Sequence, residues 1–208
     1  MSRLESIVVG AAIAVACPLL LFVFCWWTTA ALQMNRVLPI SVDFAIAAAW
    51  TGLALGVALD LGSVRRWARG FYAANLKVLV FLYLCLSVIA VAFCMGVPLG
   101  NIVLGTIAGL YVGRRHVHAR ASAETFAKSV RQTSLFAAAV TALEALPIGL
   151  LGLGERHITG RIAAMTGLSE SLLTGPVGMG AVLVLCGLLF VIQYGCTRLA
   201  ATVAFRAE

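Results

Sequence analysis

Residues 7–32 read IVVGAAIAVACPLLLFVFCWWTTAAL and contain no charged side chain. A helix that crosses a lipid bilayer needs about 20 consecutive apolar residues, and this run exceeds that length. Trp26 and Trp27 lie near its C-terminal end, as expected for aromatic side chains at a membrane interface. The run is also longer than the roughly 7–15-residue core of a signal peptide. We therefore predict a retained membrane-spanning helix, with signal-peptide cleavage near Ala30 or Ala31 as the alternative.

Five further apolar runs follow along the chain, at residues 44–61, 78–95, 101–113, 133–152 and 177–197. The 208 residues are 62% hydrophobic and only 11% charged, and the mean hydropathy is +1.04. Soluble domains are usually about 45–50% apolar and about 25% charged. The sequence predicts an all-α integral membrane protein in which residues 1–208 form one transmembrane domain of six helices.

The orientation of these helices follows from the basic residues between them. With the N-terminus inside and the spans alternating, all but three of the 15 Lys and Arg residues lie in the cytoplasm, and only Arg36, Arg156 and Arg161 lie outside. Short cytoplasmic loops of membrane proteins carry such an excess of positive charge. We therefore predict a multi-pass protein of the cell membrane with both termini inside, and a tight outer turn at residues 96–100, where Gly96, Pro98 and Gly100 interrupt helix formation.

The net charge of +7 indicates the kind of partner. The basic residues lie between apolar runs and form no stripe with interleaved aromatics, so nucleic acid is not expected. Residues 62–77 combine Arg65, Arg66 and Arg69 with Trp67 and Phe71, a composition typical of a segment against lipid headgroups. We expect anionic lipid headgroups on the cytoplasmic side as the main partner.

Small residues recur every fourth position on two of the predicted spans. Gly105, Gly109 and Gly113 form one stripe, and Gly52 and Gly56 continue another that begins at Ala48. Such stripes let helix backbones approach closely in lipid. They predict packing within one subunit, with a homodimer or a partner membrane subunit as alternatives. Asp60 and Asn101 continue the two rows and should point into the bundle, Asp60 near the inner surface and Asn101 near the outer one.

Glu144 is the sharpest functional candidate because it lies near the predicted centre of the fifth span. An acidic side chain at that depth costs about 2.5–3.5 kcal/mol on insertion scales, so it should face the protein interior. Pro147 leaves the carbonyl of residue 143 without a donor and favours a kink beside it. Glu144 is predicted to bind a ligand or a proton. The alternative is a purely structural carboxyl group, hydrogen-bonded to Thr141 or to a neighbouring helix.

Two further polar groups are candidates. Asp60, Gln193 and Arg198 are expected to form an inner polar cluster that holds helices together or gates a pathway. The longest predicted outer loop, residues 153–176, carries Arg156 and Arg161. This loop either lies as a helix at the interface or covers the outer mouth of the bundle, where the two arginines would attract an anionic ligand.

The chain contains no motif typical of a hydrolase, a nucleotide-binding enzyme or a metalloenzyme, so we assign no catalytic residue, no metal site and no cofactor. Its six cysteines form no C-x-x-C pair and are expected to be buried thiols, with a Cys25–Cys94 disulfide as the alternative. Three hypotheses remain open: a small-solute transporter or its substrate-binding membrane subunit, a structural or assembly subunit of a larger membrane complex, and an intramembrane enzyme acting on a lipid-linked substrate. The absence of catalytic motifs favours a protein that is not an enzyme.

Overall fold

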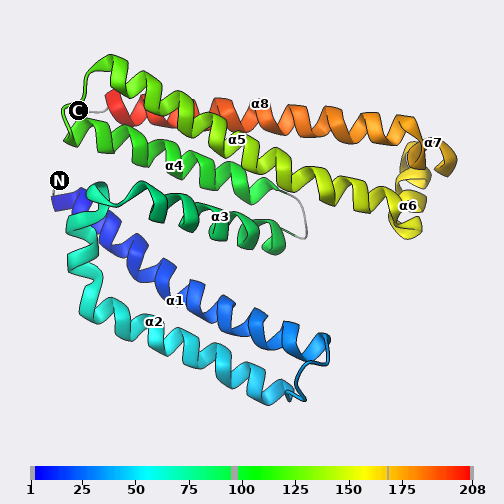
Figure 1. The fold of residues 1–208 in the computed structure, drawn as a ribbon, viewed down its shortest axis with the longest axis horizontal. Helices are drawn as coiled ribbons and strands as arrows, with labels where there is room; N and C mark the ends of the chain where they lie inside the picture. Colours follow the sequence, from blue (N-terminus) through cyan, green and yellow to red (C-terminus); the bar gives the residue numbers. More distant parts are fainter. Residues whose placement is uncertain (1–2, 95–97, 168, 207–208) are drawn as a thin grey trace. The chain divides into compact units, whose positions relative to one another are not determined.

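Long helices joined by short connections make up the protein (Figure 1). The computed structural model describes residues 3–94, 98–167 and 169–206. No strand occurs among these residues, so the predicted all-α fold class is confirmed. The chain is organised in two compact units, Met1–Ala74 and Asn75–Glu208, called unit 1 and unit 2 below.

Unit 1 is a pair of long helices that pack closely on each other. It contains α1 (Arg3–Met34), α2 (Val42–Gly70) and the short 3-10 helix η1 (Phe71–Ala73). The Ser41 side chain caps α2 by accepting a hydrogen bond from the backbone N–H of Phe44 at 3.2 Å. A Cβ atom on Gly52 would lie 2.5 Å from the carbonyl oxygen of Leu21, so the two backbones meet where α2 has no side chain.

Unit 2 contains four long helices and two short ones. These are α3 (Leu76–Phe93), α4 (Leu99–His118), α5 (Ala123–Gly154), α6 (Arg156–Thr166), α7 (Glu170–Thr174) and α8 (Pro176–Arg206). Helix α4 packs against α3, α5 and α8, and α5 also packs against α8. Figure 1 shows α6 and α7 together at the end of unit 2 where α5 ends and α8 begins.

The contact between α4 and α8 runs along three buried glycines, Gly105, Gly109 and Gly113. A Cβ atom on Gly105 would collide with the side-chain amide of Gln193, and one on Gly109 or Gly113 would collide with a backbone carbonyl of α8. The helices therefore approach more closely than any side chain larger than hydrogen would allow.

Five of the described helices are long and apolar enough to cross a membrane. The apolar lengths are Val9–Met34, Val42–Val64, Leu76–Phe93, Ala123–Gly154 and Pro176–Arg206. The predicted run 101–113 falls on α4, which is not among these five. Asn101 and the basic last turn of α4, with Arg115, His116 and His118, lower its hydropathy.

The helices extend beyond several predicted boundaries. Helix α2 continues nine residues past the predicted end at 61, to Gly70, so much of the expected headgroup loop is helical. Between residues 61 and 70 only Gly62 disfavours helix, and a single glycine costs about 1 kcal/mol. The outer segment 153–176, for which an interfacial helix was one of the two expectations, contains α6 and α7. Helix α6 ends at Thr166 and is followed by Gly167, whose φ of 72° suits glycine.

Short connections flank α4. Only residues 119–122 separate α4 from α5, where the Ser122 side chain accepts from the N–H of Thr125 at 3.3 Å. In the predicted outer turn, Gly96 and Val97 lie outside the described residues, and α4 begins directly after Pro98. Cys25 and Cys94 are both free thiols.

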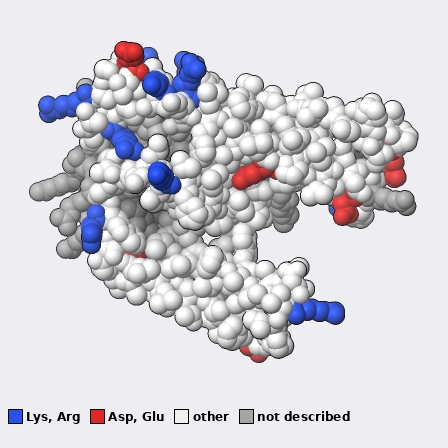
Figure 2. Space-filling model, viewed as in Figure 1, with Lys and Arg blue, Asp and Glu red and all other residues white. Residues whose placement is uncertain are grey.

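Basic side chains gather at one end of unit 2. Figure 2 shows Lys and Arg atoms clustered where α4 and α5 are joined, while mostly uncharged atoms cover the middle of these helices. This end carries Arg114, Arg115 and Arg120 near the end of α4, and Lys128 and Arg131 in the first turns of α5. Exposed large apolar residues such as Leu143, Leu151 and Val184 lie on the longer apolar parts of α5 and α8, as a lipid-facing surface requires.

Candidate functional site

The Glu144 carboxylate joins three helices of unit 2. The Ser87 hydroxyl on α3 donates to Glu144 Oε2 at 2.7 Å, and the Asn101 Nδ2 group on α4 donates to the same oxygen at 2.6 Å. Ser87 and Asn101 are fully buried, whereas Glu144 on α5 is half-buried. Two donors on one carboxylate oxygen are the arrangement that an acidic group needs in an apolar interior.

The start of α4 brings Asn101 to this position. Helix α4 begins at Leu99, and the Asn101 backbone N–H donates to the Pro98 carbonyl at 3.2 Å within the first turn. The N-terminus of a helix carries a partial positive charge and favours a nearby carboxylate. Asn101 was expected near the outer surface and Glu144 near the bilayer centre, but the structure places them in direct contact. The reason is that α5 continues for ten residues beyond Glu144 to Gly154, so α4 starts level with the interior of α5.

Tyr83 and Ser87 share one face of α3 because residues four apart on a helix lie above each other. Both are buried, and they are the polar members of the buried row Tyr83, Ser87 and Val91. The Tyr83 ring packs on Phe136 of α5 with ring centroids 5.3 Å apart. The Tyr83 hydroxyl lies close enough to Glu144 for an electrostatic interaction. The sequence reasoning missed both residues, although their spacing inside an otherwise apolar run was a usable signal.

Two buried atoms of these residues have no hydrogen-bond partner in the described part of the chain, Asn101 Oδ1 and the Tyr83 hydroxyl oxygen. An unsatisfied polar atom in a protein interior costs about 1–3 kcal/mol, so such atoms call for a functional explanation. Asn101 Oδ1 accepts a hydrogen bond and the Tyr83 hydroxyl can donate one. With the Glu144 carboxylate, the site offers an acceptor, a donor and a negative charge to a small polar molecule.

The Asn101 amide can serve Glu144 in either protonation state. In the structure, Nδ2 donates to Glu144 Oε2, which is the contact that an ionised carboxylate would make. A protonated Glu144 would instead carry a donor, and a half-turn of the amide would present Oδ1 as its acceptor. The exchange needs no change in shape, because the amide oxygen and nitrogen occupy similar volumes.

Thr141 is buried on α5 but takes no part in the hydrogen bonds to Glu144 Oε2. Its hydroxyl donates to the carbonyl of Ala137 at 3.0 Å, within the same helix. Arg161 lies exposed on α6. Arg156 is the first residue of α6, and its side chain lies outside the described part of the structure.

Gln193 is fully buried on α8 opposite Gly105. Its Nε2 donates to Thr197 Oγ1 at 3.3 Å, and the Thr197 hydroxyl donates to the Gln193 carbonyl at 2.9 Å. Gln193 Oε1 has no hydrogen-bond partner among the described residues. Arg198, one residue after Thr197, is exposed.

Asp60 belongs to unit 1, where it is 6% exposed on α2. Neither of its carboxylate oxygens accepts a hydrogen bond from a nitrogen or oxygen atom of the described residues, and the Cys17 side chain of α1 interacts with the carboxylate. It lines a cavity of about 440 Å³ together with Ala14, Val57, Leu61 and Val64. Because Gln193 and Arg198 belong to unit 2, the inner polar cluster that would join all three residues stays a prediction.

Taken together, the five long apolar helices define the chain as a helical membrane protein, and unit 2 holds a buried polar network around one carboxylate. Comparison with protein families, with curated proteins and with solved structures finds no match.

Proposed function

We propose that the protein is a small-solute transporter, or the substrate-binding membrane subunit of one, with Glu144 in its binding site. The observation that supports this proposal most strongly is the contrast within the network. Glu144 Oε2 is held by Ser87 and Asn101, yet two buried atoms, Asn101 Oδ1 and the Tyr83 hydroxyl oxygen, have no hydrogen-bond partner among the described residues. A purely structural network would be expected to satisfy all its buried polar atoms.

The position of Glu144 along α5 agrees with this proposal. Ten residues separate it from Gly154, the end of the helix, which corresponds to about 15 Å at about 1.5 Å per residue. The hydrocarbon core of a bilayer is about 30 Å thick. If the outer end of α5 reaches the membrane surface, Glu144 lies near the midplane, the depth at which transporters bind their substrates.

The proposal includes six spans in the cell membrane, namely the five long apolar helices and α4, with both termini in the cytoplasm. Helix α4 packs against α3, α5 and α8, so its polar and glycine positions are turned toward protein rather than lipid. A helix covered by its neighbours can cross a bilayer with lower hydropathy than a lipid-exposed one. In this orientation, the basic end of unit 2 faces the anionic lipid headgroups of the cytoplasmic leaflet.

Reporter fusions test this orientation. An alkaline phosphatase fused after Arg206 should stay inactive and a green fluorescent protein at the same place should fluoresce, because both report a cytoplasmic end. Fusions after Gly154, in the predicted outer segment, should give the opposite pair of signals. An active phosphatase after Arg206 would contradict the proposed cytoplasmic C-terminus, and with it the arrangement of six spans with both termini inside.

Glu144→Gln is the variant that tests the binding site, since it removes the charge and keeps the size of the side chain. Detergent-purified protein should be screened for thermal stabilisation by a panel of small polar solutes. We expect a stabilising solute to lose at least about tenfold in affinity for Glu144→Gln, equivalent to about 1.4 kcal/mol. Glu155→Gln is the matched control, because Glu155 is exposed at the end of the same helix.

The screen also addresses the second candidate function, a subunit that assembles with a second copy or with another membrane protein. The hydrogen bonds from α3 and α4 to one carboxylate agree with the structural role that this candidate gives to Glu144, because they would hold three helices of the chain in register. Equal affinity of a stabilising solute for the native chain and Glu144→Gln would contradict the transport proposal. Stable co-purification with partner helices, together with tolerance of Glu144→Gln, would favour assembly.

A further inference from the structure

A pocket in unit 2 lies between α3, α4 and α5 and has a volume of about 480 Å³. Ligand pockets typically measure about 300–1,000 Å³, so its size suits an organic molecule. The polar lining residues are Arg115, His116, Ser129, Gln132 and Thr133, and the others are Leu76, Leu79, Val80, Tyr83, Ala108, Val112 and Phe136. Among the described residues that line it, none is acidic.

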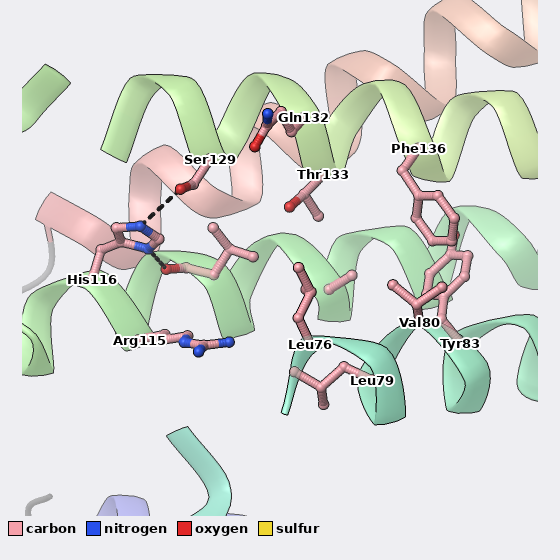
Figure 3. Close-up of a pocket in the computed structure, with 12 residues that line it drawn as sticks. Leu76, Leu79, Val80, Tyr83, Arg115, His116, Ser129, Gln132, Thr133 and Phe136 are labelled. Atoms are coloured by element: carbon pink, nitrogen blue, oxygen red, sulfur yellow. Dashed lines mark hydrogen bonds between the residues drawn. The ribbon is translucent and has the colours of Figure 1, made fainter. Parts of the chain in front are cut away.

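The lining changes from polar to apolar along the pocket, as Figure 3 shows. Arg115, His116 and Ser129 lie at one end, and Tyr83 and Phe136 lie at the other. From Ser129 to Phe136 is seven residues of α5, or about 10 Å of helix. The polar end is the end of unit 2 where the basic side chains gather and where α4 and α5 are joined.

Hydrogen bonds hold the polar end in place. His116 Nδ1 lies 2.8 Å from the carbonyl oxygen of Val112, and Nε2 lies 3.0 Å from Ser129 Oγ. A carbonyl oxygen only accepts hydrogen bonds, so Nδ1 carries the proton, and in the neutral ring the Ser129 hydroxyl donates to Nε2. The ring also contacts Phe126 edge-on, with centroids 5.8 Å apart. His116 is therefore a half-buried group fixed between α4 and α5, rather than part of a solvated basic surface.

We propose that this pocket binds an anionic phospholipid from the surrounding bilayer. The phosphate lies at the Arg115 end, and the start of an acyl chain runs toward Tyr83 and Phe136. The guanidinium of arginine suits a phosphate group because its donors match the phosphate oxygens. The pocket is polar where α4 and α5 are joined and becomes apolar two helical turns deeper. A lipid leaflet changes in the same way, from its headgroups to its acyl chains. A free phosphate would leave the apolar lining unused, so a lipid explains the whole pocket.

This lipid site does not depend on the proposed transport function, although it adjoins the Glu144 network. Tyr83 contributes to both, because its ring ends the apolar part of the pocket and its hydroxyl lies near the carboxylate. A bound acyl chain would press on the face of α3 that also carries Ser87.

The test uses the full chain purified in detergent and stripped of lipid. Phosphatidylglycerol, phosphatidylcholine or inorganic phosphate is added, and binding is followed by native mass spectrometry and by the melting temperature. We expect phosphatidylglycerol to bind at least about tenfold more tightly than phosphatidylcholine, with one tightly bound lipid per chain. Equal binding of the two lipids would overturn the proposal, and so would inorganic phosphate that displaces the bound phosphatidylglycerol.

Three variants locate the site. Arg115→Gln should weaken phosphatidylglycerol binding about tenfold or more, and Leu79→Trp should abolish it by filling the half-buried apolar side of the pocket. Lys128→Gln removes one positive charge from an exposed position at the same end of unit 2 and should bind lipid as the native chain does. If Arg115→Gln does not fold, Leu79→Trp still decides, since it keeps every charge. Unchanged lipid binding by Leu79→Trp, or an equal loss in Lys128→Gln, would contradict the site.

Discussion

Replacing Gly109 with alanine should destabilise unit 2 by about 1–3 kcal/mol, the usual cost of forcing an extra methyl group into a packed interior. A Cβ atom at this position would collide with the carbonyl oxygen of Thr197 on α8 and would lie 3.2 Å from the Cβ atom of Ala200. The carbonyl belongs to the helix backbone and cannot rotate away as a flexible side chain could. The two helices would have to separate along their contact.

The matched control is Gly187→Ala on α8, where no described atom outside its own helical surroundings lies within 4 Å of the added methyl group. Alanine is favoured over glycine in a helix by up to about 1 kcal/mol, so this change should be neutral or stabilising. The two variants carry the same substitution, but the change in the free energy of unfolding is expected to have opposite signs in them. Unfolding by a graded denaturing detergent, followed by circular dichroism, measures both. Equal changes in the unfolding transition of the two variants would show that the close approach of α4 and α8 does not stabilise the fold.

Asn101→Ala should lower the free energy of unfolding by about 2–3 kcal/mol, because the Glu144 carboxylate then keeps only the hydrogen bond from Ser87. Hydrogen bonds to a charged group contribute about 1.5–3 kcal/mol, and an unsatisfied buried acceptor costs a similar amount. The same substitution in a Glu144→Ala background should cost less than about 1 kcal/mol. The difference between the two values measures the coupling of the two residues.

Asn35→Ala provides the control for Asn101→Ala. Asn35 is exposed in unit 1, and its Nδ2 donates only to the Ala31 carbonyl one turn earlier, at 2.8 Å. An exposed local hydrogen bond of this kind should contribute less than about 0.5 kcal/mol. If Asn101→Ala cost the same with and without Glu144, the hydrogen bond between them would contribute nothing to stability, and the network described above would lose its basis.

Much of the fold could be predicted because hydropathy is a property of consecutive residues. The six apolar runs all fall on separate long helices. The boundaries were less accurate. Helix α2 continues to Gly70, because polar residues outside an apolar run can form helix as readily as those within it.

The candidate site could be predicted only in part. The cost of an acidic side chain in lipid singled out Glu144, and the four-residue spacing of its row pointed Asn101 into the bundle. The structural alternative for Glu144 named either Thr141 or a neighbouring helix as its partner. The Thr141 hydroxyl bonds to Ala137, and the partners lie on neighbouring helices, where Ser87 was overlooked. A serine is uncharged and common in helices of membrane proteins, so it carries little signal until a neighbouring helix shows what it contacts.

The sequence by itself predicts a helical membrane protein with a buried carboxylate that requires hydrogen-bond partners. The identity of those partners depends on how far each helix is shifted along its neighbours. Ser87 and Asn101 lie 57 and 43 residues before Glu144, and they reach it only because α4 begins level with the interior of α5. Hydropathy and spacing describe one helix at a time, whereas the shift between helices is set by side-chain packing across them. The contacts around Glu144, and the polar-to-apolar pocket beside Arg115, therefore emerge only when the helices are packed together.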